Sequence, residues 1–261
     1  MKGYLFITDL DGTLLNSKQE ISLENKKAIQ EFQENGGLFT IATGRMEKAV
    51  ETFVKELNID IPMILYNGAK VVCPLSGETL MEKHLDVPSE VMQNVNELAK
   101  DEVGMLFYQD KKVYTTTKNQ YIYEYEAKEK VTVEINEDVF EKPITKVLLI
   151  GECERLRSVE TTIEEWNVPV DLIYSEATYL EILPKGSSKG EAVRFLKNHL
   201  NHSTIYTICI GDNLNDLSMI HEADRGIAVE NAHPELKEKA DHVTVHHEQH
   251  SLANVLMGLG K

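Results

Sequence analysis

The chain has 261 residues, 42% of them apolar, which is enough for one large domain or two smaller ones. Its 27 basic and 43 acidic side chains give a formal net charge of −16. This acidic balance argues against nucleic acid or an anionic membrane as a partner, and it requires a local positive site for any anionic ligand.

The cysteine spacing and the apolar runs indicate the cellular compartment of the protein. Cys73, Cys153 and Cys209 are scattered, without the spacing of a zinc ribbon or a disulfide framework. Cys209 lies in the apolar run IYTICIG, where we expect a buried, inert thiol. No basic start leads into a long apolar core, and no apolar run approaches the ~18 residues of a membrane span. We therefore expect a soluble cytoplasmic protein.

The first part of the chain alternates apolar strand-like runs with amphipathic helical stretches. Ser22 is the expected N-cap of the first helix, and Gly36 is its expected C-terminal stop. In chain order we expect a strand at 3–8, a helix within 22–37, a strand at 38–43, a helix at 47–58 and a strand at 63–67.

The last part of the chain repeats this alternation. It predicts an α/β fold with a parallel sheet and helices on both faces, in which ligands bind beyond the carboxyl ends of the strands. The expected elements are a helix at 187–200, a strand at 205–211, a helix at 215–223, a strand at 226–229, a helix at 234–240 and a strand at 242–245.

The middle of the chain has a different texture. It contains a tyrosine-rich segment at 111–130, an apolar strand at 145–151 and a hairpin-like stretch at 171–184. The glutamates beside YIYEY favour core or pocket packing over the stacking of nucleic-acid bases. We interpret this region as an inserted α/β unit, and the division as core 1–82, insert 83–184 and core 185–261.

Two aspartates, Asp9 and Asp11, end the first apolar run in YLFITDLDGTLLN. In a continuing strand both would point the same way and repel each other. A calcium loop is excluded because Leu14 replaces the required glycine and a strand replaces the entering helix. A carboxylate can instead attack phosphorus, with Mg²⁺ offsetting charge and Asp11 moving protons. Gly12 would allow a sharp turn there.

Two further clusters offer groups for an anion. Thr43 and Gly44 in TIATGR are a natural cradle for a phosphate oxygen, although Thr-Gly is also an ordinary turn. Ser188 and Glu191 have the spacing of a capping box, which places Lys189 in a first helical turn. The helix dipole disfavours a cation there, so we expect Lys189 to face anions such as Asp9; the alternative is a solvated lysine.

The fourth cluster is GDNLND at residues 211–216. Asp212 ends a buried strand and is suited to hold Mg²⁺ through oxygen. Asn215 and Asp216 stand at the helix entrance, where capping is the ordinary role, but the cluster is denser in polar groups than a cap demands. In HHEQH, at 246–250, the second histidine comes one residue too early for a zinc protease, so we expect a solvated polar turn.

Taken together, D-x-D-G-T, T-G-R, a late K-G and G-D-x-x-N-D resemble the haloacid dehalogenase (HAD) superfamily, over essentially the whole chain. EILPKGSSKGEAV, GDNLNDLSMI and AVENAHPELKEKADHVT are similar to its Cof-type (class IIB) phosphatases. The resemblance implies a Rossmann-like core with an α/β cap domain inserted after the third core strand. It also implies a Mg²⁺-dependent phosphatase that acts through an aspartyl phosphate on a small phosphorylated metabolite, such as a sugar phosphate or a phosphorylated cofactor.

The resemblance also implies a role for each matching residue. Asp9 would be the nucleophile and Asp11 the acid/base. Phosphate would be bound by Thr43, Gly44, Lys189 and Asn215, and the metal by Asp9, the Asp11 carbonyl, Asp212 and the supporting Asp216. A phosphomutase would share the nucleophile and is the alternative enzyme; a receiver-like signalling module, about half this length, is a more distant one.

Overall fold

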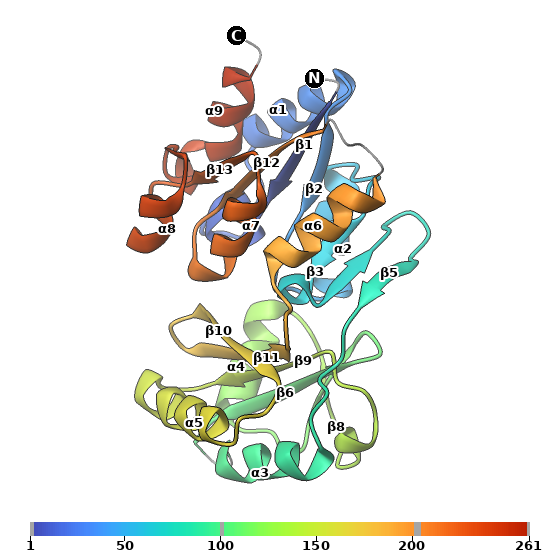
Figure 1. Ribbon diagram of the computed structural model, residues 1–261, viewed down its shortest axis with the longest axis vertical. Coiled ribbons are helices and arrows are strands. Elements are labelled where there is room, and N and C mark those ends of the chain that lie inside the picture. Colours follow the sequence, from blue (N-terminus) through green and yellow to red (C-terminus); the bar gives the residue numbers. More distant parts are fainter. Residues whose placement is uncertain (1–2, 100–101, 201–204, 260–261) are drawn as a thin grey trace. The chain divides into compact units, whose positions relative to one another are not determined.

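The structure is a computed structural model that describes residues 3–99, 102–200 and 205–259 (Figure 1). The chain forms two compact units, which are described separately. The first comprises Met1–Arg45, Val50–Met81 and Ser188–Lys261, and the second comprises Met46–Ala49 and Glu82–Ser187.

A five-stranded parallel sheet forms the centre of the first unit. Its strand order is β14-β13-β12-β1-β2, so the first strand pairs with one some 200 residues later (Figure 1). This confirms the expected α/β fold with a parallel sheet. The strands are β1 (Tyr4–Thr8), β2 (Leu38–Ile41), β12 (Tyr206–Gly211), β13 (Arg225–Ala228) and β14 (His242–Val243).

A second, three-stranded sheet lies next to the end of β2. A parallel bridge joins Ala42 to Ile64, and this places the new sheet beside the parallel one. Only the first of its strands was predicted, because the other two are runs of three and four residues without a readable period. The strands are β3 (Met63–Leu65), β4 (Lys70–Val72) and β5 (Thr79–Glu82).

Six α-helices belong to the first unit over the described residues. The Ser22 hydroxyl accepts a hydrogen bond from Asn25 N (3.2 Å), which confirms the predicted N-cap. The last helix was not predicted. Its Ala253 N donates a hydrogen bond to Asn25 Oδ1 of the first helix (3.0 Å). The helices are α1 (Leu23–Glu34), α2 (Glu47–Glu56), α6 (Lys189–His199), α7 (Leu217–Glu222), α8 (Pro234–Lys239) and α9 (Ser251–Gly258).

The core of the first unit is apolar. Phe6 of β1 stacks on Phe39 of β2, with ring centroids 6.0 Å apart, and meets Phe32 of α1 edge-on at 6.1 Å. Cys209 is fully buried, and burial raises the pKa of its thiol, which confirms the expected inert cysteine.

The HHEQH segment differs from the expected solvated turn. Residues His247–Gln249 form a short 3₁₀ helix. The ring of His247 is only 15% exposed, and its Nδ1 hydrogen bonds to Leu15 O at 2.8 Å. The expectation is therefore wrong for His247, because a distant loop offers its ring a buried carbonyl.

Over its described residues, the second unit is a six-stranded mixed sheet of order β10-β11-β9-β6-β7-β8 with three α-helices. The predicted hairpin at 171–184 is confirmed as β10 and β11. The strands are β6 (Gly104–Gln109), β7 (Lys112–Thr115), β8 (Val133–Ile135), β9 (Lys146–Ile150), β10 (Val170–Glu176) and β11 (Tyr179–Pro184). The helices are α3 (Ser89–Ala99), α4 (Gln120–Glu129) and α5 (Cys153–Glu165).

The tyrosine-rich segment of this unit forms α4. Tyr125 is buried, and its hydroxyl lies 2.6 Å from that of Tyr108. Tyr125 and Ile122 thus agree with the predicted core packing, whereas Tyr123 is 56% exposed. Across the described ranges, none of the helices is both long and apolar enough to span a bilayer.

Candidate active site

Asp9 occupies the first position beyond the carboxyl end of β1. Its backbone nitrogen donates to Ile210 O of β12 (3.0 Å), so the parallel sheet fixes where the side chain emerges. The residue is only 5% exposed. Burial raises the pKa of the Asp9 carboxyl well above its usual range, against the attraction of Lys189, which lowers it.

Lys189 is the buried positive charge of the site. Ser188 caps α6 by accepting from Glu191 N (3.1 Å), which places Lys189 in the first turn as predicted. Its Nζ lies 2.6 Å from Asp9 Oδ1 and 2.5 Å from Asp216 Oδ1. Burial alone would lower the pKa of Lys189, but Asp216 and Asp9 outweigh it and raise the pKa. The lysine therefore stays charged between two carboxylates.

Asp212 and Asp216 come from the loop after β12. Asp216 Oδ2 accepts from Asp212 N (2.9 Å) and Asn213 N (3.1 Å), while Asn213 caps the short helix Leu214–Asp216. Burial, followed by repulsion from Asp216, raises the pKa of the Asp212 carboxyl to about 7. Lys189 thus contacts Asp9 and Asp216, and its charge also acts on Asp212.

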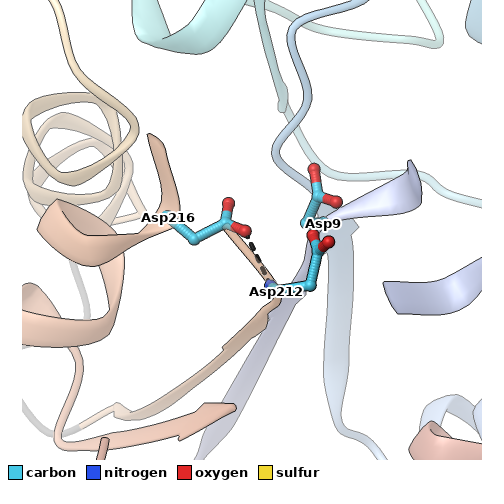
Figure 2. A group of neighbouring side chains, drawn as sticks. All are labelled: Asp9, Asp212 and Asp216. Atoms are coloured by element: carbon cyan, nitrogen blue, oxygen red, sulfur yellow. Dashed lines mark hydrogen bonds between the residues drawn. The ribbon is translucent and has the colours of Figure 1, made fainter. Parts of the chain in front are cut away.

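These three acids form a set that fits a divalent cation. One oxygen each from Asp9, Asp212 and Asp216 lies within 4.8 Å of the others (Figure 2). All of these donors are hard oxygens, the type that Mg²⁺ prefers. A cation there would also favour the charged carboxylates that burial disfavours.

β1 ends at Thr8, in agreement with the predicted strand at 3–8, so Asp9 and Asp11 do not have the spacing of a continuing strand. Gly12 turns the chain with φ +72°. A Cβ on Gly12 would meet Asp212 Oδ2 at 2.4 Å, so the predicted turn needs this glycine. The half-exposed Asp11 side chain instead pairs with Arg45, with Nε–Oδ2 2.9 Å and NH2–Oδ1 2.7 Å.

Thr43 and Gly44 follow β2 at the same sheet edge as Asp9, because Thr8 pairs with Ile41 in the parallel register. Thr43 O accepts from Asn67 N (3.0 Å), and Asn215 Nδ2 donates to Asn67 Oδ1 (3.1 Å). A Cβ on Gly44 would lie 2.9 Å from Asn67 Nδ2. Asn67 therefore joins the TGR cluster to the GDNLND cluster.

The structure brings all eight sequence-derived site residues to one edge of the first unit, and it adds two that sequence reasoning missed. Arg45 was visible in the sequence as the third residue of TGR, but its ion pair with Asp11 was not. Asn67 is fully buried at φ +52°, and its only sequence signal is the turn-forming pair Asn-Gly after a strand.

Several known proteins are similar to this chain in fold and in sequence. The family model described as haloacid dehalogenase-like hydrolase matches residues 6–256. The solved structure TM0651 from Thermotoga maritima is 32% identical, with a TM-score of 0.85, covering 99% of this chain and 97% of its own. YcsE of Bacillus subtilis, a 5-amino-6-(5-phospho-D-ribitylamino)uracil phosphatase, is 29% identical over 92% of this chain and 89% of its own.

A more distant protein shares the fold. The HAD subclass IIB sugar phosphatase BT4131 shares it, with a TM-score of 0.85 at 20% identity over 98% of this chain and 99% of its own. The chain belongs to the haloacid dehalogenase-like hydrolase family, whose model covers nearly its whole length. It is an enzyme of the phosphatase class.

Proposed function

We propose that this protein is a Mg²⁺-dependent phosphatase that hydrolyses small phosphorylated metabolites through a phosphoryl group carried on Asp9. The observation that carries the proposal is the placement of Asp9. It is a buried carboxylate at a strand end, held 2.6 Å from a buried lysine and within reach of two further acids. A structural aspartate would gain nothing from such repulsive neighbours, whereas a nucleophile toward phosphorus needs this combination.

The first half-reaction forms a bond between an Asp9 carboxylate oxygen and phosphorus. The bond from phosphorus to the substrate's ester oxygen breaks, and Asp11 gives that oxygen a proton so that it leaves as an alcohol. In the second half-reaction Asp11 takes a proton from water, the water oxygen bonds to phosphorus, and the bond to Asp9 breaks. Inorganic phosphate leaves and both aspartates are restored. Arg45 donates to both Asp11 oxygens, so proton transfer by Asp11 must use a remaining lone pair of one oxygen or open this pair.

The phosphate would be held by the positive and polar groups of the same edge. Lys189 supplies the local charge that a chain of net charge −16 must provide for an anion. Thr43, Gly44 and Asn215 supply hydroxyl and amide groups. Asp9, Asp212, the Asp11 carbonyl and the supporting Asp216 would hold Mg²⁺, which when bound neutralises charge on the reacting phosphate.

The substrate would be a sugar phosphate or a phosphorylated cofactor. The printed names of YcsE and BT4131, one a ribitylaminouracil phosphatase and the other a sugar phosphatase, support this class. We propose that residues 83–184 form the cap domain between the core parts 1–82 and 185–261, and that the cap selects the substrate. The three free cysteines fit a cytoplasmic location.

The test is the Asp9→Asn variant, assayed by phosphate release from a panel of phosphorylated metabolites. The change is nearly isosteric but removes the nucleophile, so we expect an intact fold without activity. The exposed Asp60→Asn is the matched control and should keep wild-type turnover. Retention of a tenth of wild-type turnover by Asp9→Asn would defeat the proposal. Isomerisation of a sugar phosphate that needs a sugar bisphosphate, without release of inorganic phosphate, would identify a phosphomutase instead.

A further inference from the structure

The loop that carries Asp11 is held by residues from the far end of the chain. It follows β1, bends at Gly12 and closes a wide turn with a hydrogen bond from Leu15 N to Leu10 O (2.9 Å). The carbonyls inside such a turn have no strand or helix partner, and buried backbone groups require one. Two of them, and the Leu15 carbonyl directly after the turn, are bound by side chains beyond residue 230.

These three side chains form what we call the C-terminal clamp: Asn231, His247 and Ser251. A carbonyl oxygen only accepts hydrogen bonds, so His247 carries its proton on Nδ1 here. The three bonds are Asn231 Nδ2 to Gly12 O (2.8 Å), Ser251 Oγ to Thr13 O (2.9 Å) and His247 Nδ1 to Leu15 O (2.8 Å).

Asn231 is the centre of the clamp. Its Oδ1 accepts from His247 N (3.0 Å), so both ends of its amide are used and two clamp residues are coupled. Two residues further, His233 N donates to Asp212 O (2.7 Å). Segment 231–233 thus ties the Asp11 loop on one side and the loop of a candidate metal ligand on the other.

The clamped loop also touches Asp212 directly. Thr13 Oγ1 donates to Asp212 Oδ1 (3.3 Å), and the Gly12 Cα faces the same carboxylate. A shift of the loop would therefore move Asp11 relative to Asp9, which the sheet holds in place. Misplacement of a proton donor by about 1 Å is enough to cost a large part of its effect.

We propose that the C-terminal clamp is a positioning element for the proton transfer by Asp11, and that Asn231 is its principal positioning residue. This inference rests on the proposed function of Asp11. The HHEQH segment, which sequence analysis set aside as a solvated turn, supplies one of its three contacts.

Substrates with different leaving groups separate positioning from stability. An alkyl phosphate must release a strongly basic alcohol oxygen, so it needs the proton from Asp11. The phenolic oxygen of p-nitrophenyl phosphate leaves without one. Weaker folding lowers the activity toward both substrates equally, whereas a displaced Asp11 lowers the activity toward the alkyl phosphate more.

The experiment compares kcat/KM for the two substrates in Asn231→Ala, which removes the amide. With the alkyl phosphate we expect a loss of about tenfold or more, and with p-nitrophenyl phosphate less than about threefold. Ser251→Ala is a milder second variant and should show the same contrast at smaller size if Asn231→Ala fails to fold. Asn25→Ala is the matched control, because it also loses a buried amide contact to the C-terminal segment but not to the loop.

The Asp11→Asn variant tests the role of Asp11 itself, separately from the clamp that positions it. It should show the largest contrast between the substrates. If it shows none, the proposed role of Asp11 falls and the clamp proposal falls with it. If Asp11→Asn shows the contrast while Asn231→Ala and Ser251→Ala lower both activities equally, or match Asn25→Ala, the clamp proposal alone is overturned.

Discussion

Lys189 shows how much a single residue holds together in this site. It is fully buried, and it lies between two carboxylates that otherwise face each other and Asp212. Removing one partner of a buried ionic cluster leaves uncompensated charge, which typically costs about 3–5 kcal/mol. The first-turn position of this lysine opposes the helix dipole and makes sense only because of these acids.

We expect Lys189→Met to lower activity by at least about 100-fold, because the phosphate loses its main positive partner. It should also lower the free energy of unfolding by about 3 kcal/mol at pH 8 without metal. Steady-state kinetics and urea denaturation measure the two effects. The exposed Lys185→Met is the control and should change neither by much. A Lys189→Met protein of wild-type activity would remove the lysine from the mechanism.

At the residue scale, the sequence predicted which side chains form the site, but not every contact between them. The predicted contact of Lys189 with Asp9 is present because a capping pattern fixed its helical turn. The turn at Gly12 was expected, but the pairing of Asp11 with Arg45 was not. The direction in which this turn sends the chain depends on a positive φ at the glycine, and a sequence does not state the sign of φ.

At the scale of elements, α6 and α7 pack closely at Gly190. A Cβ there would lie 2.4 Å from Ser218 O, and Gly190 N donates to Ser218 Oγ (3.0 Å). This approach keeps Lys189 and Asp216, from neighbouring helix starts, within 2.5 Å of each other. The glycine after the lysine in the K-G pattern is thus a packing requirement.

We expect Gly190→Ala to destabilise the protein by about 1–3 kcal/mol, because a backbone carbonyl must shift. Thermal unfolding measures this, and activity should fall as the helices separate. Gly258→Ala in α9, where nothing lies within 4 Å, is the control and should be neutral or stabilising. Equal melting temperatures for the two variants would contradict the packing account.

In the first unit the order of the major elements was predictable because hydrophobic periodicity marks them clearly. In the second unit only β9 and the β10–β11 hairpin were predicted, and the helices α3, α4 and α5 and the strands β6, β7 and β8 were not. The short strands β4 and β5 and the helix α9 were missed, since their few residues gain order from tertiary contacts rather than from local pattern. The same reason hid the C-terminal clamp, whose hydrogen bonds join residues 219 to 238 positions apart.

At the scale of the whole molecule, the acids of the site link stability to pH and to metal. The pKa of Asp212 is raised to about 7 in the folded protein, so the folded state binds its proton more tightly than the unfolded state. The stability from this proton is fully present below the ordinary aspartate pKa of 3.8 and is lost as the pH rises through about 7.

The metal-free protein in EDTA should therefore have a lower free energy of unfolding at pH 8 than at pH 5.5, as urea denaturation would measure. Mg²⁺ should stabilise it more at pH 8, where the acids are charged, and should restore activity lost to EDTA. In Asp212→Asn the dependence on pH and on Mg²⁺ should be weaker. A stability unaffected by Mg²⁺ at either pH would remove the metal from this site.

The most direct test follows the phosphoryl group itself. In a rapid-quench experiment with labelled p-nitrophenyl phosphate, Asp11→Asn should still be phosphorylated, because this leaving group needs no proton, but should lose the label slowly. We expect the label on Asp9, identified by mass spectrometry of the peptide, and in shorter-lived form in the wild type. Product formation without label on the protein, or with label on another residue, would contradict the central claim that Asp9 attacks phosphorus.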